Sequence, residues 1–250
     1  MEAKLNLKIE NFVGKSAVVY SKYNGSLKVG TPNYYNERLS LVIMMASAGI
    51  LKGDDYQYEI TCGNKTKTII TEQSYTKIFN TGLEGAKKHV NIRLEGNASL
   101  FYRPSPVIPF EGSCFSCDSV INLDKNSEFL CTDIFASGRI GMGEKFAFSK
   151  YRNRICVFLD NKPIWLDNCF LDSDNMDLRK LVFFDGYTHQ GTLFYYGFKE
   201  KEQELLEYET KSPVLFGKTS STAGVCIRVL ANTAQDIEEE FDRIEQMILR

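Results

Sequence analysis

The residues most capable of chemistry gather in two polar segments of an otherwise apolar, strand-rich sequence. The first segment begins at a glycine-acid corner, Gly53-Asp54, and ends in a polar cluster over residues 71–77. The side chains of that cluster that could contact a ligand are Thr71, Gln73, Ser74, Thr76 and Lys77. Polar groups at strand ends predict either a functional site or a turn in which Asp54 serves only as a cap.

The second segment is a glycine-rich loop that carries one arginine and one glutamate. Gly138, Gly141 and Gly143 fall within six residues, a density that lets the backbone bend sharply or approach another group closely. Arg139 and Glu144 at its two ends predict a structural ion pair, or else a charged pair that faces a cavity or a partner protein.

Phosphate and calcium loops are excluded by missing glycines. Residues 217–220 read Gly-Lys-Thr-Ser, but the first glycine of a P-loop would fall at Ser212-Pro213 and is absent. Residues 172–177 begin like a calcium loop, yet Met176 occupies a ligand position and the required glycine is missing. A solvated acidic turn is the better interpretation.

Tight metal centres and hydrolytic triads are also poorly supported. Cys114 and Cys117 form a lone C-x-x-C without a second pair, and alternation in a strand would point the two thiols to opposite faces. Only His89 and His189 could supply imidazole, and no serine sits in a G-x-S-x-G elbow. Buried structural cysteines are therefore expected.

Bulk composition narrows the class of partner. A net charge of −2 and a pI near 5.9 provide no electrostatic case for nucleic acid or an anionic membrane. The longest apolar run, residues 41–46, is far shorter than a membrane span, and no signal-peptide pattern opens the chain. We therefore expect a cytoplasmic protein whose seven cysteines are reduced.

Alternating apolar residues at intervals of roughly 8–12 residues predict a mainly β fold. No linker divides the chain, so we expect a single domain over residues 1–250. Residues 56–60 and 67–71 are expected to be two strands joined by a turn at Gly63-Asn64. The other predicted strands are 4–10, 16–20, 39–45, 89–94, 99–102, 114–123, 128–135, 145–151, 155–159, 164–171, 191–198 and 225–230.

The C-terminus has the spacing of a helix instead. Thr233 and Asp236 form an N-terminal capping pattern ahead of one apolar stripe. That stripe consists of Ile237, Phe241, Ile244 and Ile248. The helix is expected to pack on its own sheet, or alternatively on a partner protein, and residues 174–180 could form a short second helix.

The order and spacing of these features resemble the urease accessory protein family UreD, also called UreH. The matching segments are Lys52-Gly-Asp54, Thr71–Lys77, the proline-containing stretch Phe101–Phe110, Gly138–Phe146 and the late strand Cys226–Ala231. They cover roughly residues 48–231. Two departures stand out, since Lys52 replaces a usual second glycine and Glu72 interrupts a usual pair of threonines.

The resemblance implies an elongated, mainly β scaffold of stacked sheets or β-helix-like form, with a C-terminal helix. It implies a protein that is not an enzyme and has no tightly bound cofactor. The implied partners are urease apoenzyme subunits, a UreF-type accessory protein and, through it, a UreG-type GTPase. The implied cargo is Ni²⁺ on its way to the urease active site.

From this we derive a hypothesis for the two polar segments. Ni²⁺ in transit needs weak, open ligation, which carboxylate, hydroxyl and water oxygens provide better than imidazole or thiolate. Transient nickel contacts are expected at Asp54 and Glu144, with Lys77 and Arg139 balancing charge. The other residues expected to border the path are Thr71, Gln73, Ser74 and Thr76.

A different class of protein is the alternative to an accessory scaffold. Thirteen Tyr and seventeen Phe could form the platform of a carbohydrate-binding β-sandwich or a hydrolase. Aromatic residues that alternate within strands mostly belong to a core, and the chain has a single Trp, so this reading ranks lower.

Overall fold

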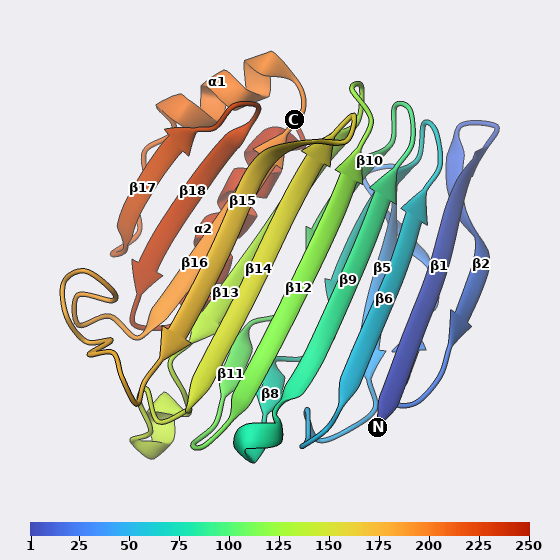
Figure 1. The fold of residues 1–250 in the computed structure, drawn as a ribbon. Coiled ribbons are helices and arrows are strands. Elements are labelled where there is room, and N and C mark those ends of the chain that lie inside the picture. The colour runs from blue at the N-terminus through green and yellow to red at the C-terminus, as the bar shows by residue number, and fades with distance from the viewer.

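Two stacked β-sheets and a layer of two helices form the molecule, in a computed structural model that describes all 250 residues (Figure 1). The seven-stranded sheet, here the front sheet, runs β15-β14-β12-β9-β6-β1-β2. Its strands are β1 (Glu2–Phe12), β2 (Lys15–Tyr23), β6 (Asp55–Cys62), β9 (Ala86–Leu94), β12 (Cys114–Leu123), β14 (Lys150–Leu159) and β15 (Lys162–Asp172).

The eleven-stranded sheet, here the back sheet, runs β17-β18-β16-β13-β10-β7-β5-β3, with β4, β8 and β11 attached beside this path. Its main strands are β5 (Arg38–Met45), β7 (Lys67–Glu72), β10 (Ser99–Arg103), β13 (Glu128–Ala136), β16 (His189–Tyr196), β17 (Leu215–Ser220) and β18 (Val225–Ala231). The short strands are β3 (Leu27–Val29), β4 (Asn33–Tyr35), β8 (Thr76–Ile78) and β11 (Val107–Pro109).

The chain winds between the sheets like a β-solenoid. From β5 to β14, successive long strands alternate between the back and front sheets and pair in parallel with the strand one coil earlier. One end of each coil is closed by a tight turn, at residues 63–66, 95–98 and 124–127. The opposite end, at the bottom of Figure 1, carries the long crossings with β8, β11 and two 3₁₀ turns, Gly82–Glu84 and Ile140–Met142.

Strand alternation decides which side chains enter the space between the sheets. In β1, Ala3, Leu5, Leu7 and Ile9 are buried while the residues between them are exposed. The same rule gives the back sheet two buried faces, one against the front sheet and one against the helices. The predicted mainly β, stacked-sheet and β-helix-like architecture is confirmed.

Helices α1 (Lys199–Glu207) and α2 (Ala234–Ile248) cover the outer face of the back sheet. Thr233 Oγ1 accepts the Asp236 N–H at 3.1 Å, so the predicted N-cap is present. The expected apolar stripe of α2 is fully buried against β13, β16 and β18, so this helix packs on its own sheet.

The expected hairpin over residues 56–71 is wrong. Strand β6 pairs with β1 and β9 in the front sheet, whereas β7 pairs with β5 and β10 in the back sheet. The turn over residues 63–66 connects a strand of the front sheet to a strand of the back sheet, instead of joining two neighbouring strands of one sheet. A turn of this length serves either purpose, so local sequence does not separate them.

Two further expectations are wrong. Residues 145–149 belong to a crossing, and one strand, β14, replaces the two that were expected; its outward Arg152 pairs with Asp118 at 3.1 Å. Residues 174–180 form turns: Met176 donates its N–H to the Asp172 carbonyl at 2.8 Å as in a helix, but the pattern does not continue, and Lys180 donates to the Asp177 carbonyl at 3.2 Å. The second helix is α1.

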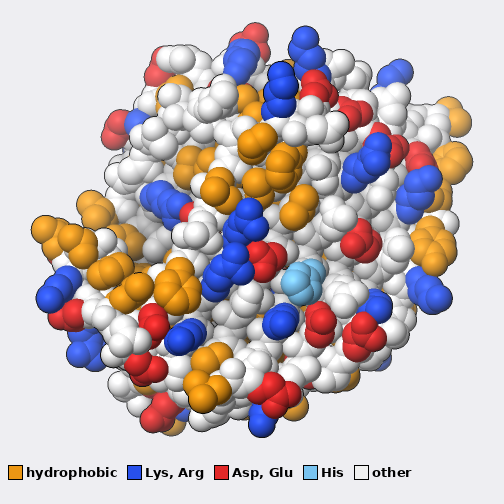
Figure 2. All heavy atoms as spheres, viewed as in Figure 1, with side chains coloured by type: hydrophobic (Ala, Val, Ile, Leu, Met, Phe, Trp, Pro, Cys, Tyr) orange, Lys and Arg blue, Asp and Glu red, His pale blue; other side chains and the backbone are white.

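The outer face of the front sheet mixes both signs of charge with patches of apolar side chains (Figure 2). Val120, Leu166 and Phe170 are among the large exposed apolar residues of this sheet. Neither of the two helices has the length and apolar character that crossing a membrane requires.

Candidate functional site

Both predicted polar segments lie at the end of the solenoid that holds the long crossings. Asp54 is buried directly before β6, where its carboxylate accepts hydrogen bonds from the Met1 ammonium and the Leu51 N–H, each at 2.8 Å. Gly53 beside it has φ of +72°, a conformation that favours glycine. Asp54 therefore caps this turn and holds β1 to it.

The segment from Thr71 to Lys77 divides between two surroundings. Thr71 shares the face of Ile69, which packs on the helix side of the back sheet. Gln73, Ser74, Thr76 and Lys77, with Ser47 and Tyr58, line a cavity of about 430 Å³ that we call the mouth cavity. Because Gln73, Ser74 and Lys77 are exposed, this cavity opens to solvent.

The glycine-rich loop forms the expected ion pair. Arg139 Nε donates to Glu144 Oε2 at 2.8 Å, and Glu144 Oε1 accepts the Glu111 N–H at 2.9 Å. The Arg139 guanidinium also lies 4.3 Å from the centre of the Phe110 ring. A side chain at Gly138, whose φ is +141°, would collide with the Glu144 carbonyl; Gly143 also has positive φ, whereas Gly141 has open space around it.

The structure thus brings the expected residues together in separate groups. Gln73, Ser74, Thr76 and Lys77 share one cavity, and Arg139 holds Glu144. Asp54 and Glu144 have no partner in common, and Lys77 makes no ion pair.

The interior holds a second polar feature that sequence reasoning missed. Lys88 on β9 and Glu72 at the end of β7 form an ion pair of 2.6 Å between the sheets, and each side chain is less than one-tenth exposed. Thr76 Oγ1 lies 3.4 Å from Glu72 Oε2, and the Lys88 ammonium lies 4.5 Å from the centre of the Tyr58 ring. The alternation of Ala86, Val90 and Ile92 places Lys88 on an apolar face, a signal that could have found it.

A small inner cavity of about 50 Å³ continues from this ion pair between the sheets. Glu72 and Thr76 line both the mouth cavity and the inner cavity. Tyr102 lines the inner cavity, and its buried hydroxyl has no hydrogen-bond partner within the protein. An unpaired buried hydroxyl in a cavity that Glu72 and Asp133 also line indicates a place for water.

Asp133 on β13 lines the inner cavity from the back sheet. Burial raises its pKa to about 6, and the charge of Asp167 adds to this rise. A hydrogen bond from Asn153 and the charges of Arg228 and Lys88 act in the opposite direction. Asp133 is therefore mostly ionised at neutral pH, but only by a small margin.

The cysteine beside this carboxylate is not a strong metal ligand at neutral pH. Burial raises the pKa of the Cys117 thiol to about 11, which keeps it protonated. All seven cysteines are free. Cys117 lines the inner cavity, whereas Cys114 is the first residue of the same strand and lies on its other face.

Polar residues between the sheets continue toward β15, β16 and β18. There, Arg228 Nη2 donates to Asp167 at 2.6 Å and Nη1 donates to Thr192 at 3.0 Å. No three His, Cys, Asp or Glu side chains lie close enough together to hold a metal ion as a group. The interior polar residues are Glu72, Thr76, Lys88, Tyr102, Cys117, Asp133, Asn153, Asp167 and Thr192, whereas the Arg228 side chain is 43% exposed.

Fold and site together define a class of protein: a β-solenoid scaffold, backed by helices, whose apolar interior is crossed by separate oxygen donors. Such donors can contact a cation one or two at a time but cannot enclose it. The chain belongs to the UreD urease accessory protein family, whose model matches residues 1–250, and the resemblance seen in the sequence is confirmed.

Individual relatives agree over nearly the whole chain. The urease accessory protein UreH of Helicobacter pylori (strain G27) is 30% identical over 250 residues, which cover 98% of this chain and 94% of the relative. UreD of Acetivibrio thermocellus is 28% identical over 255 residues, covering 99% and 97%. UreD of Flavobacterium johnsoniae is 32% identical over 217 residues, covering 84% and 78%. This chain is a urease accessory protein.

Proposed function

We propose that this accessory protein conducts Ni²⁺ to urease apoenzyme through the two cavities between its sheets. The observation that supports the proposal is that Glu72 and Thr76 line both cavities, so polar side chains lead from the mouth cavity to the inner cavity. An apolar sandwich has no need of such a surface, because buried polar groups cost free energy unless they are paired.

The chemistry of the lining suits transit rather than storage. Ni²⁺ is held tightly by imidazole and thiolate, whereas the lining offers carboxylates, hydroxyls and a protonated thiol. Asp133 and Glu72 supply carboxylates at two successive points, and a carboxylate that is free to contact a divalent cation lowers the cost of moving that cation out of water. The ion moves by exchanging one or two oxygen ligands at a time.

The proposed partners are urease apoenzyme subunits, a UreF-type protein and a UreG-type GTPase that acts through it, in the cytoplasm. The chain itself performs no catalysis in this proposal. Nucleic acid and membranes are not among the partners, because a net charge of −2 attracts neither. A sugar platform is not supported, since the single Trp165 is stacked on Phe194 in the core, 4.4 Å between ring centres.

Blocking the inner cavity tests the path. Ser119 lines this cavity from β12, whereas Ser116 lies on the outer face of the same strand. We expect Ser119→Leu to lower the initial rate of urease activation at least about tenfold, because the leucine fills the passage. Activation and the nickel content of urease are measured with purified partners and Ni²⁺, after gel filtration has confirmed complex formation.

Ser116→Leu is the matched control, with the same substitution on the other face of the strand. If both leucine variants activated urease like the wild type, nickel would have to travel by another route.

We propose that Asp54 and Glu144 contact Ni²⁺ transiently at the end of the solenoid that holds the long crossings. The ion would meet them before it enters the mouth cavity or after it leaves. Asp54→Ala and Glu144→Ala are expected to slow activation even when the variants are folded and bind their partners. Normal activation by such variants would leave both carboxylates with a structural role alone.

A further inference from the structure

The ion pair between Glu72 and Lys88 lies where the mouth cavity meets the inner cavity. Glu72 reaches this place from the back sheet, and Lys88 reaches it from the front sheet. Since Glu72 lines both cavities, an ion that moves between them along their shared lining passes this carboxylate.

Both members of this ion pair have hydrogen-bonding groups without a close partner. Glu72 Oε1 accepts from Lys88 at 2.6 Å, while Oε2 has only the long 3.4 Å contact with Thr76. The Lys88 ammonium has three N–H donors and one acceptor, Glu72; its other near neighbour is the Tyr58 ring. A carboxylate with one strong partner keeps lone pairs available for another cation.

The ammonium and a divalent cation compete for the same charge. With Lys88 in place, Glu72 is neutralised, and a second cation close by is repelled. The lysine side chain is a flexible four-carbon stem, so the ammonium can swing away while its backbone stays in the strand. A second carboxylate, Asp133, lines the same inner cavity and offers the displaced ammonium another partner.

We propose that Lys88 is a gate on the nickel path: its ammonium occupies a cation site at Glu72 until Ni²⁺ displaces it toward Asp133. The groups that face the ammonium are Glu72, Tyr58, Tyr102 and Cys117. With the ammonium on Glu72 the path is closed to cations, and with the ammonium on Asp133 it is open. This proposal rests on the proposed function and adds the residue that controls passage.

Nickel binding to the isolated chain tests the gate without urease. Equilibrium dialysis with ⁶³Ni²⁺ compares wild type, Lys88→Met and the double variant Lys88→Met/Glu72→Gln. Lys88→Met removes the competing charge, so we expect it to bind Ni²⁺ at least about tenfold more tightly than wild type. The double variant lacks the carboxylate and is expected to lose that gain.

Lys52→Met is the matched control, because Lys52 pairs with Glu84 at 3.0 Å on the exposed surface. It is expected to leave nickel affinity unchanged. If Lys88→Met bound Ni²⁺ no more tightly than wild type, or if the double variant kept the gain, the gate would be disproved.

A folding defect does not remove the test. Should Lys88→Met fail to fold, Lys88→Gln takes its place, since the amide keeps a donor for Glu72 but carries no charge. Because dialysis uses the isolated chain, a negative result overturns the gate alone, while the Ser119→Leu experiment still decides whether the interior conducts nickel.

Discussion

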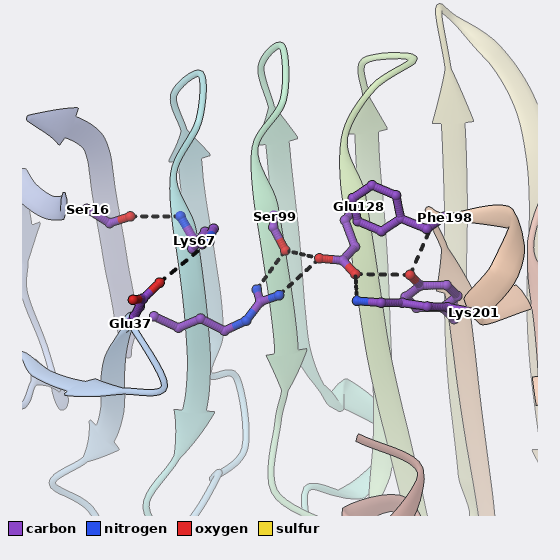
Figure 3. A network of polar contacts seen from close by, with 9 residues as sticks. Ser16, Glu37, Lys67, Ser99, Glu128, Phe198 and Lys201 are labelled. Atoms are coloured by element: carbon purple, nitrogen blue, oxygen red, sulfur yellow. Dashed lines mark hydrogen bonds and ion pairs between the residues drawn. The ribbon is translucent and has the colours of Figure 1, made fainter. Parts of the chain in front are cut away.

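Two buried ion pairs join arginine or lysine to glutamate in this molecule, and their surroundings differ. Glu128, at the tight-turn end of the solenoid, accepts from Arg38 at 3.0 Å, Ser99 at 2.6 Å, Tyr195 at 3.0 Å and Lys201 at 3.2 Å (Figure 3). Glu72, between the cavities, has one short contact, to Lys88 at 2.6 Å.

The electrostatics of the two sites differ in the same way. Burial alone would raise the pKa of Glu128, but the Ser99 hydroxyl and the charges of Arg38 and Lys201 more than offset it, so that the pKa is lowered. The Arg38 guanidinium is also stacked 4.3 Å from the centre of the Phe101 ring. A carboxylate with four donors is fixed, whereas one with a single flexible donor can exchange it.

The largest effect is expected when the cation is removed from either pair. Arg38→Met and Lys88→Met should each lower the free energy of unfolding by about 3–5 kcal/mol, because each leaves a buried carboxylate short of its cation. Urea unfolding of both variants measures this loss.

Adding NiCl₂ then separates the two sites. Lys88→Met should recover stability with Ni²⁺, and Arg38→Met should not. Equal recovery in both variants would mean that nickel acts elsewhere on the surface and would remove the distinction between the pairs.

A smaller effect is expected at Asp133, whose pKa of about 6 exceeds its usual value of 3.8. Between about pH 4 and 6 the folded state binds more protons than the unfolded state, so stability falls as pH rises through this window. Asp133→Asn should abolish that fall and be more stable at pH 7 by about 2–3 kcal/mol. Thermal unfolding across pH 4–7 measures it, and an unchanged slope in the variant would contradict the assignment.

The smallest effects should come from the hydroxyl beside each carboxylate. Ser99→Ala removes a 2.6 Å hydrogen bond to Glu128 and should cost about 1–2 kcal/mol. Thr76→Val removes only a 3.4 Å contact to Glu72 and should cost less than about 0.5 kcal/mol. Chemical denaturation of the two variants side by side tests this, and a larger loss for Thr76→Val would show that Glu72 is held more firmly than its contacts indicate.

The sequence predicted the local parts of the fold well, because they depend on periodicity. Alternation in β1 and the helical stripe of α2 were both readable, and so was the pairing of Arg139 with Glu144. The placement of β6 and β7 in different sheets was not readable, because it depends on strands far away in the chain rather than on the turn between them.

Only some residues of the interior site could be predicted from the sequence, for a similar reason. Gln73, Ser74 and Thr76 stood out as polar residues near a strand end, and they do line one cavity. Lys88 and Asp133 were hidden inside strands, where one polar residue at an apolar position is easily assigned to the solvent face. Their proximity depends on two sheets coming together, which strand patterns alone do not reveal.

The most direct test of an interior nickel route is to locate the ion. Crystals of Lys88→Met are soaked in NiCl₂, and anomalous diffraction is recorded at the nickel absorption edge, with Lys88→Met/Glu72→Gln crystals as the control. We expect a nickel peak beside the Glu72 carboxylate, between the two sheets, that is absent from the control. Nickel peaks confined to the outer surface of both variants would contradict the route.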